Sequence, residues 1–255
     1  MSIESHPIVW TTTKIEKIWD YYGTNPAYNN AYFAKHSGHR VLSEVDKLVG
    51  VTGNILDVGC GPGYLLEHMK KLPSWSSYTG IDTSEKSLEE VNRKGIDEKR
   101  HIEGFLVQNA GRIKDKSVDR IFCVEVMEHC DDDTLRNILS MIHRVVKQDG
   151  YVVITTPNTE DLNKATQICP DCGCIYHKWQ HVRTWTCHEL SDFVRSCGFD
   201  IYSVFSCHFG REDLGRGIVD RFAALCRHGK NWRFSFLHLP QILLLATPHK
   251  QSERN

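Results

Sequence analysis

The chain has 255 residues, with 31 Lys and Arg against 32 Asp and Glu and a pI near 6.9. That length allows one α/β domain with a sizeable core or two small ones, and the balanced charge argues against a general attraction to nucleic acid or anionic membrane. Because no basic-then-apolar leader and no apolar run of roughly 20 residues is present, we expect a cytoplasmic protein with no membrane span, whose ten cysteines are reduced thiols, some of them holding metal.

Residues 1–50 precede the first expected sheet strand, and we interpret them as an N-terminal helical cap. Helices are expected over 13–22 and 39–48, with a turn cluster at 23–26 between them. The segment is rich in tyrosine and phenylalanine, which bury large areas wherever they lie. We therefore expect its aromatic side chains to pack against the domain that follows.

Residues 51–250 are expected to form a single α/β domain, because strand-length apolar runs alternate with helical patterns, as in a parallel sheet. The expected strands are 54–59, 77–82, 102–107, 118–124, 150–156, 199–206 and 241–247. The expected helices are 63–72, 84–94, 132–147 and 187–197. We interpret two stretches as insertions: 157–185, rich in Cys and His, and 207–240, with a helical pattern over 211–228.

The first of these strands ends in three glycines at alternate positions, Gly59, Gly61 and Gly63, and a helical pattern follows at once. Glycine permits a sharp turn and a close approach of ligand to backbone. A dinucleotide fingerprint would read G-x-G-x-x-G, but here the third glycine comes one position early. Asp57, just before the turn, would repel a pyrophosphate and attract a cationic amino-acid group. The pattern therefore favours a ligand that carries positive charge.

The run from Asp57 to Gly63 resembles the first motif of class I S-adenosylmethionine (SAM)-dependent methyltransferases. The next strand ends in Asp82, and an acid at that point binds the ribose hydroxyls in this family. The resemblance implies a Rossmann-like α/β fold, with a seven-stranded class I methyltransferase sheet and helices on both faces, to which this chain adds a Cys/His-rich insert. It also implies SAM as the cofactor.

The same resemblance implies the cofactor-binding residues. Asp57 and the three glycines would hold the methionine portion, Asp82 the ribose, and Asn109 the adenine edge. A plain polar residue at the end of a strand is the other interpretation of Asn109. Glu125 also falls at the carboxyl end of a strand, where ligands of such sheets bind.

After the fourth strand, Glu125, Glu128 and His129 are spaced so that they would meet on one face of a helical turn. Two carboxylates and an imidazole there can hold a divalent cation. This region, with the later His181, resembles the ubiquinone-biosynthesis O-methyltransferases and the enzymes that 2′-O-methylate the 3′ end of small RNAs. In the latter group, a Glu-x-x-Glu-His motif and a later histidine bind a metal, so the resemblance implies Mg²⁺ or another divalent cation here. Alternatively, Glu128 and His129 only shape a loop beside the cofactor.

The chemistry suits these residues, because the SAM sulfonium already activates its methyl group. A hydroxyl acceptor must also lose a proton, either because a cation lowers its pKa or because a neutral histidine accepts the proton. His129 and His181, with Glu128, are therefore the expected catalytic groups.

Cys169 and Cys172 flank a tight turn, with Gly173 and Cys174 following. Such a knuckle lets two thiolates face one zinc ion, and we expect a structural zinc because a 29-residue loop otherwise lacks a core. Cys174, His177 and His181 are the candidates for the remaining ligands, and His181 is claimed by both this site and the acid cluster. A redox pair or free thiols are the other interpretations.

We therefore predict a SAM-dependent methyltransferase that acts on a hydroxyl of a small molecule or glycan. Three alternatives differ in class: methylation of an RNA end, methylation of carbon or nitrogen, and a non-catalytic, zinc-containing partner protein. Nucleic acid is the less favoured partner because of the neutral charge. The sequence does not indicate the acceptor or the oligomeric state.

Overall fold

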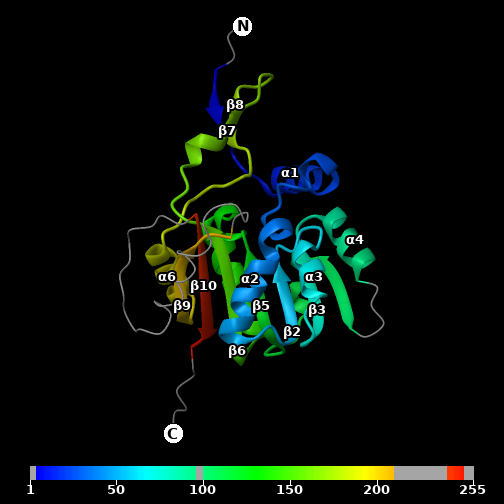
Figure 1. Cartoon of the computed structure of the whole chain (residues 1–255). Helices are drawn as coiled ribbons and strands as arrows, with labels where there is room; N and C mark the ends of the chain where they lie inside the picture. Colours follow the sequence, from blue (N-terminus) through cyan, green and yellow to red (C-terminus); the bar gives the residue numbers. More distant parts are fainter. Residues whose placement is uncertain (1–3, 96–99, 210–239, 250–255) are drawn as a thin grey trace.

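A computed structural model of the chain describes residues 4–95, 100–209 and 240–249. Its centre is a seven-stranded sheet with the strand order β4-β3-β2-β5-β6-β10-β9 (Figure 1). In chain order these strands are β2 (Gly53–Val58), β3 (Trp75–Asp82), β4 (His101–Leu106), β5 (Val118–Val124), β6 (Val146–Pro157), β9 (Phe199–Cys207) and β10 (Gln241–Pro248). The strand β10 runs antiparallel to both of its neighbours, β6 and β9, and the other strand pairs of this sheet are parallel. All seven strands expected from the sequence are confirmed.

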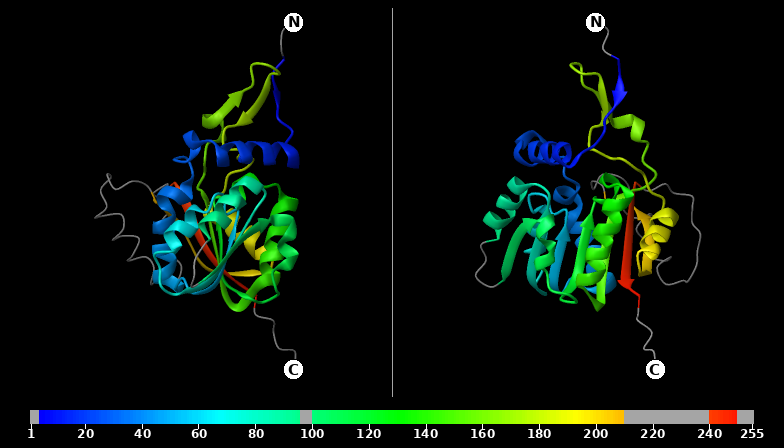
Figure 2. Two further views of the ribbon diagram at one scale, coloured as in Figure 1. Left: turned by 90° about the vertical axis from the view of Figure 1, so that its right-hand side faces the viewer. Right: turned by 180° about the vertical axis from the view of Figure 1, so that it is seen from behind.

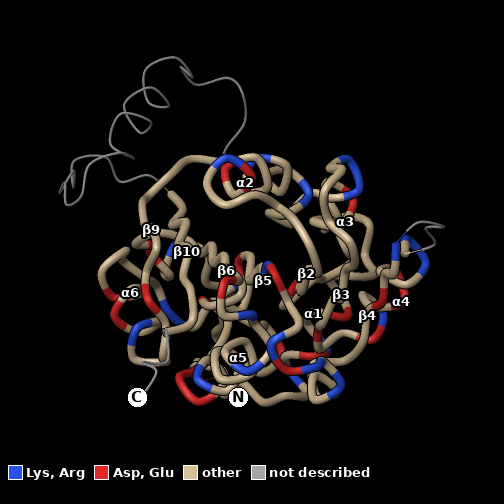
Figure 3. The backbone as a smooth tube through the Cα atoms, turned by 90° about the horizontal axis from the view of Figure 1, so that it is seen from below, with Lys and Arg blue, Asp and Glu red and all other residues tan. Residues whose placement is uncertain are grey.

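Helices cover both faces of the sheet, as predicted, because its strands alternate apolar side chains between two cores. One core joins the sheet to α2 (Phe33–Val49), α3 (Tyr64–Met69) and α4 (Glu85–Lys94). The other joins it to α5 (Asp132–Val145) and α6 (Cys187–Ser196). Seen along the sheet, these two groups of helices lie on opposite sides of the strands, and Lys and Arg are interspersed with Asp and Glu along the outer elements (Figure 3).

The N-terminal residues form two helices with different positions. The helix α2 packs its buried Val41, Leu42 and Val45 into the core, so it is part of the domain. The helix α1 (Thr12–Thr24) instead lies across the end of the sheet at which the parallel strands finish (Figure 2). A 3₁₀ turn, η1 (Pro26–Tyr28), follows it.

A second, three-stranded sheet, with the strand order β1-β8-β7, lies beyond the carboxyl ends of the parallel strands of the main sheet. It consists of a hairpin of β7 (Thr166–Ile168) and β8 (Cys174–His177), to which β1 (His6–Pro7) adds a parallel strand. The predicted insert at 157–185 is therefore a hairpin joined to the N-terminal residues. The sequence did not predict these three short strands.

Three further 3₁₀ turns connect the main elements: η2 (Val107–Arg112), η3 (Met127–His129) and η4 (Leu162–Ala165). The helical pattern over 211–228 falls within 210–239, outside the described residues. Among the described residues, no helix has both the length and the apolar character that a bilayer crossing requires.

Candidate functional site

The turn after β2 is built from glycines with positive φ angles: 71° at Gly59, 49° at Gly61 and 79° at Gly63. A Cβ on Gly59 would lie 2.5 Å from Val126 Cγ2, and one on Gly61 would lie 3.4 Å from the Tyr32 ring. Residues other than glycine rarely adopt this backbone conformation. The turn therefore needs glycine both for its conformation and for its close packing.

Asp82, at the end of β3, closes the turn from the neighbouring strand. Its carboxylate accepts hydrogen bonds from the backbone N–H groups of Gly61, at 2.8 Å, and Ser84, at 2.9 Å. Burial raises the pKa of Asp82. Gly59, Gly61 and Asp82 line one large cavity, so the structure brings these three predicted residues together.

Asp57 and Gly63 lie behind this wall and are not among the cavity-lining residues. Asp57 is buried, and its carboxylate accepts a 2.7 Å hydrogen bond from the Tyr78 hydroxyl. Burial raises the pKa of Asp57 to about 7. The alternation of side chains in β2 directs Asp57 into the sheet–helix core behind the turn, and its contact with the cofactor stays a prediction. Gly63 is the N-cap of α3.

Asn109 is also displaced from its expected position. It is exposed on the 3₁₀ turn η2 and does not line the cavity. The chain turns at Val107, directly after β4, and this turn directs Val107 and Ala110 to the cavity wall. An apolar surface therefore lies where an amide was expected.

The cavity has a volume of about 990 Å³ and runs from the glycine turn to the residues after β5. Aromatic residues of α1 and its neighbours form one side of it: Trp10, Trp19, Tyr22, Tyr32 and Phe33. Its described lining includes carboxylates and histidines but no Lys or Arg; the carboxylates are Glu16, Asp82, Glu125, Glu128 and Asp131. The described lining therefore offers an anionic ligand no cationic side chain to pair with.

Glu125 follows β5 with a positive φ of 54°. Its backbone N–H donates to Thr155 O at 2.9 Å and Thr155 Oγ1 at 3.2 Å on the adjacent β6. Its Oε1 is buried without a hydrogen-bond partner, and burial raises its pKa to about 8. A non-glycine residue in this conformation is a form of strain that clusters at functional sites. The expected helical turn is therefore a strained residue followed by the 3₁₀ turn η3.

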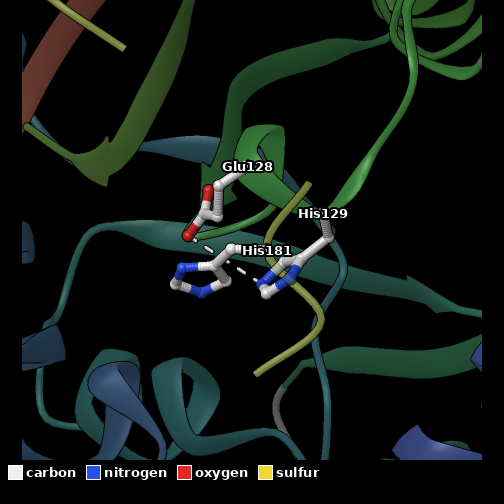
Figure 4. Close-up of side chains that lie close together, drawn as sticks. All are labelled: Glu128, His129 and His181. Carbon is white, nitrogen blue, oxygen red and sulfur yellow. Dashed lines mark ion pairs between the residues drawn. The ribbon is translucent and has the colours of Figure 1, made fainter. Parts of the chain in front are cut away.

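Glu128 and His129 lie on η3 and meet His181 from the insert (Figure 4). One ligand atom from each of these three residues lies within 4.8 Å of the other two. Glu128 Oε1 is 3.9 Å from His129 Nε2, while Glu128 Oε2 accepts from Thr156 Oγ1 at 2.8 Å. Glu128 is 1 % exposed. We call these three residues the Glu128 cluster.

Burial sets the charge state of this cluster. It raises the pKa of Glu128 well above the usual range, with Glu125 adding to the effect, and it lowers the pKa of His129 to about 3. Glu128 Oε1 and His129 Nδ1 have no hydrogen-bond partner. Buried polar atoms are normally paired, so these atoms are available to a ligand or cation.

His177 lies apart from the cysteines. It is three residues from Cys174 in β8, and an odd spacing directs two side chains to opposite faces of a strand. His177 instead stacks on His181, with ring centroids 4.5 Å apart, and forms a second group with His181 and Glu160. The expected zinc set of Cys169, Cys172, Cys174 and His177 is not assembled, and neither candidate metal group in the described residues contains a cysteine.

The model of a methyltransferase domain family matches residues 30–204, more than half of the chain. The chain belongs to this methyltransferase family. The glycine turn, the acid after β3 and the strand order agree with the class I, SAM-dependent members expected from the sequence.

Curated relatives of this methyltransferase include ubiquinone biosynthesis O-methyltransferases. That of Pasteurella multocida is 33 % identical over 121 residues, which are 43 % of this chain and 48 % of that protein. That of Cupriavidus pinatubonensis is 26 % identical over 172 residues, covering 63 % and 66 %. The chain spans about half the length of the curated relatives it matches.

Solved structures resemble the methyltransferase over nearly its whole length. A DhpI–SAH complex has a TM-score of 0.62 at 16 % identity and covers 95 % of this chain and 100 % of its own. The 1,6-didemethyltoxoflavin-N1-methyltransferase of Burkholderia thailandensis, with bound S-adenosylhomocysteine, has a TM-score of 0.61 at 12 % identity and covers 97 % and 94 %. At these identities the likeness concerns the fold.

Several site residues of the methyltransferase were not identified from the sequence. Gln180 is fully buried with a φ of 61°; its side chain accepts from Trp19 Nε1 at 3.0 Å and donates to His129 O at 2.8 Å. Glu160 contacts His181, and Tyr32 covers the glycine turn. None of these contacts is local in sequence, and the only local signal was the density of aromatic residues before residue 34.

Proposed function

We propose that this methyltransferase transfers a methyl group from SAM to a hydroxyl of a small, non-anionic acceptor. The glycine turn would hold the methionine portion, Asp82 the ribose hydroxyls, and Val107 and Ala110 the adenine face. The acceptor would occupy the remaining space between α1 and the Glu128 cluster. The observation that carries this proposal is that one cavity contains both the cofactor turn and the Glu128 cluster.

In this reaction the acceptor oxygen attacks the sulfonium methyl carbon. The C–O bond forms as the C–S bond breaks, and the products are a methyl ether and S-adenosylhomocysteine. Holding the two reactants in line supplies several kcal/mol of the required barrier reduction. The hydroxyl proton must also leave. His129, with its pKa lowered to about 3, is a weak base near neutral pH, which favours His181 as the proton acceptor.

The Glu128 cluster also fits a divalent cation. It offers a carboxylate and two imidazoles, and three protein ligands with an open position are typical of catalytic metal sites. The unpartnered Glu128 Oε1 and the neutral His129 support this fit, because imidazole ligands must be deprotonated. The Glu128 carboxyl, whose pKa burial raises, would have to release its proton when the cation binds. A bound cation would lower the pKa of the acceptor hydroxyl. Glu125 lies close enough to affect the charge of Glu128 but is outside the three-residue group.

The cavity charge favours a small molecule over RNA. Proteins hold nucleic-acid backbones mainly with Lys and Arg, and the described cavity lining has neither. The curated relatives, which are named as ubiquinone biosynthesis O-methyltransferases, support oxygen as the methylated atom. They do not fix the acceptor, which the loops around the cavity determine.

The test has two stages. Thermal unfolding with S-adenosylhomocysteine, NAD or ATP should show stabilisation by the first ligand only; stabilisation by NAD or ATP alone would overturn the assignment. A screen of hydroxyl, amine and carbon acceptors with methyl-labelled SAM should then give product on a hydroxyl. Product only on amines or carbon would exclude the O-methyltransferase proposal while preserving the cofactor assignment.

We also propose that the insert holds a structural zinc through Cys169, Cys172 and Cys174. The Cys169 sulfur accepts backbone N–H hydrogen bonds from Cys172 and Asp171, which lower the pKa of its thiol. Such bonds favour the thiolate form that binds metal. His6 in β1 is the register partner of Cys174. Because the side chains of register partners leave a sheet on the same face, His6 would replace His177 as the fourth ligand. The zinc would fasten β1 to the hairpin.

A further inference from the structure

A second group of titratable side chains lies behind the Glu128 cluster, formed by Glu160, His177 and His181. The Glu160 carboxylate lies against both imidazoles. Its Oε2 is hydrogen-bonded to His181 Nδ1, and its Oε1 is 3.8 Å from His177 Nε2. The His177 side chain is 5 % exposed, and its Nε2 has no hydrogen-bond partner.

The proton positions in this group follow from one backbone contact. The amide N–H of His181 lies 3.1 Å from His177 Nδ1. An amide nitrogen can only donate, so His177 Nδ1 must carry the lone pair, and the proton of neutral His177 is on Nε2. Glu160 Oε1 lies 3.8 Å from that nitrogen, beyond hydrogen-bond distance. A cation at His177 Nε2 would require the proton of His177 on Nδ1. That N–H would then face the backbone N–H of His181. The group therefore does not suit a second metal ion.

The position of the His181 ring proton follows from its contact with Glu160. A carboxylate is an acceptor, so the hydrogen bond to Glu160 places the His181 proton on Nδ1. Nε2 is then the ring atom of His181 with a free lone pair. Both of the roles considered for His181, as a metal ligand with Glu128 and His129 and as the base for the acceptor hydroxyl, require that lone pair.

We propose that Glu160 and His177 are positioning residues that hold His181 in its Nδ1–H tautomer. Glu160 accepts a hydrogen bond from His181 Nδ1–H. His177 accepts a hydrogen bond from the backbone N–H of His181, and the two imidazole rings stack. This arrangement matches the carboxylate–histidine pairs that orient metal-ligating and basic imidazoles elsewhere. The purpose of this arrangement rests on the proposed function, but the tautomer itself does not.

The first test measures the tautomer in the full chain without SAM or metal. Nitrogen-15 NMR of histidine-labelled protein at neutral pH reads the protonation of each ring nitrogen, with His177→Gln and His181→Gln assigning the signals. We expect His181 with its proton on Nδ1 and His177 with its proton on Nε2. A His181 proton on Nε2, or a mixture of tautomers, in the unsubstituted protein would overturn the proposal.

The second test measures what Glu160 does to metal affinity, with Co²⁺ as the probe. In Glu160→Ala, His181 should lose its preference for the Nδ1–H tautomer, and the Co²⁺ affinity should fall about 10- to 100-fold, the range for lost outer-shell partners. Glu160→Gln keeps an acceptor oxygen, so it should retain part of the tautomer preference and part of the Co²⁺ affinity. The control is Asp161→Asn, an adjacent surface residue that retains its capping oxygen. A cooperative thermal unfolding transition shows that each variant is folded.

The outcomes separate the two proposals. An unchanged His181 tautomer in Glu160→Ala contradicts the positioning role even if the protein methylates hydroxyls. An Nδ1–H tautomer that depends on Glu160, in a protein that neither binds S-adenosylhomocysteine nor transfers methyl groups, supports the positioning role and refutes the proposed function. If Glu160→Ala fails to fold, the spectrum of the unsubstituted protein and the Glu160→Gln variant still decide.

Discussion

At the scale of single residues, Asp57 shows how the fold sets the direction of a motif side chain. It was expected at the cofactor because the sequence places it before the glycine turn, but β2 directs it into the core, where Tyr78 is its partner. Sequence gives the residue type and its distance along the chain, whereas the side-chain direction depends on the strand's register in the sheet. Asn109 lies on the 3₁₀ turn η2, and its contact with the adenine edge stays a prediction.

The burial of Asp57 predicts a pH-dependent stability. Its pKa is raised from 3.8 to about 7, so between these values the folded protein binds more protons than the unfolded chain. This contribution is fully present below about pH 4 and is lost as the pH rises to about 7. Its upper bound is on the order of 4 kcal/mol, at about 1.4 kcal/mol per pKa unit.

Asp57→Asn should therefore flatten the decline in unfolding free energy between pH 4 and pH 7, since Asn keeps an acceptor for the Tyr78 hydroxyl but cannot ionise. Urea unfolding at a series of pH values measures this, with the exposed Asp133→Asn as the control. If the unfolding free energies of Asp57→Asn and of the unsubstituted protein change in parallel with pH, Asp57 does not hold an additional proton in the folded state.

Gly59 predicts a steric effect that can be separated from backbone strain. Gly59→Ala must accept a φ of 71° and a Cβ 2.5 Å from Val126 Cγ2, whereas Gly61→Ala meets only an ordinary 3.4 Å contact with Tyr32. The left-handed conformation costs about 1–2 kcal/mol in either variant. Gly59→Ala should lose more stability and S-adenosylhomocysteine affinity than Gly61→Ala.

Adding Val126→Ala to Gly59→Ala removes the clashing methyl group and should recover part of that difference. Calorimetric unfolding and ligand titration of the four proteins measure both quantities. Equal losses in the two glycine variants would show that conformation alone, and not packing against Val126, makes glycine necessary at position 59.

At the scale of elements, the long strands were predictable and the short ones were not. Strands β2 and β5 carry apolar runs that both faces of the sheet bury, and such runs are visible in sequence. Strands β1, β7 and β8 have two to four residues, too few to show a periodicity in the sequence. The strands β7 and β8 pair as a local hairpin, whereas β1 joins β8 across more than 160 positions, as His6 does with Cys174.

The strand β8 also predicts which histidine belongs to the insert's zinc. Cys169→Ser should remove zinc from the purified protein, because the knuckle loses a thiolate. His177→Ala should retain zinc, because His177 faces Glu160 and His181 from the opposite side of the strand. Elemental analysis of the two variants measures the zinc content.

His6→Ala is the matched variant, and it should lower zinc occupancy or affinity. Loss of zinc in His177→Ala with full retention in His6→Ala would reverse the assignment made from strand parity. If the unsubstituted protein contains no zinc when purified and cannot be loaded with it, the structural zinc is excluded.

At the scale of the whole molecule, the cavity is closed by segments far apart in sequence. The helix α1 lies over the carboxyl ends of the strands (Figure 2). Residues 178–182 of the insert are hydrogen-bonded to both α1 and η3. Val182 N–H donates to Glu128 O at 2.9 Å, so the segment that carries His181 is tied directly to the Glu128 cluster. The order of N-terminal cap, sheet and insert was predictable, but their meeting around one cavity was not.

Trp19 and Gln180 predict an energetic coupling between α1 and the insert. Their side chains form a 3.0 Å hydrogen bond across 161 positions, and Gln180 extends it to the His129 carbonyl at 2.8 Å. Trp19→Phe removes the donor but keeps an aromatic ring, and Gln180→Ala removes the acceptor. A double-mutant cycle on urea unfolding should give a coupling of about 0.5–1.5 kcal/mol, the net value of a buried hydrogen bond.

Lys17→Ala, on the same helix and without a contact to Gln180, should give additive effects with Gln180→Ala. Additivity in the Trp19 cycle as well would mean that α1 covers the cavity without being held there through Gln180.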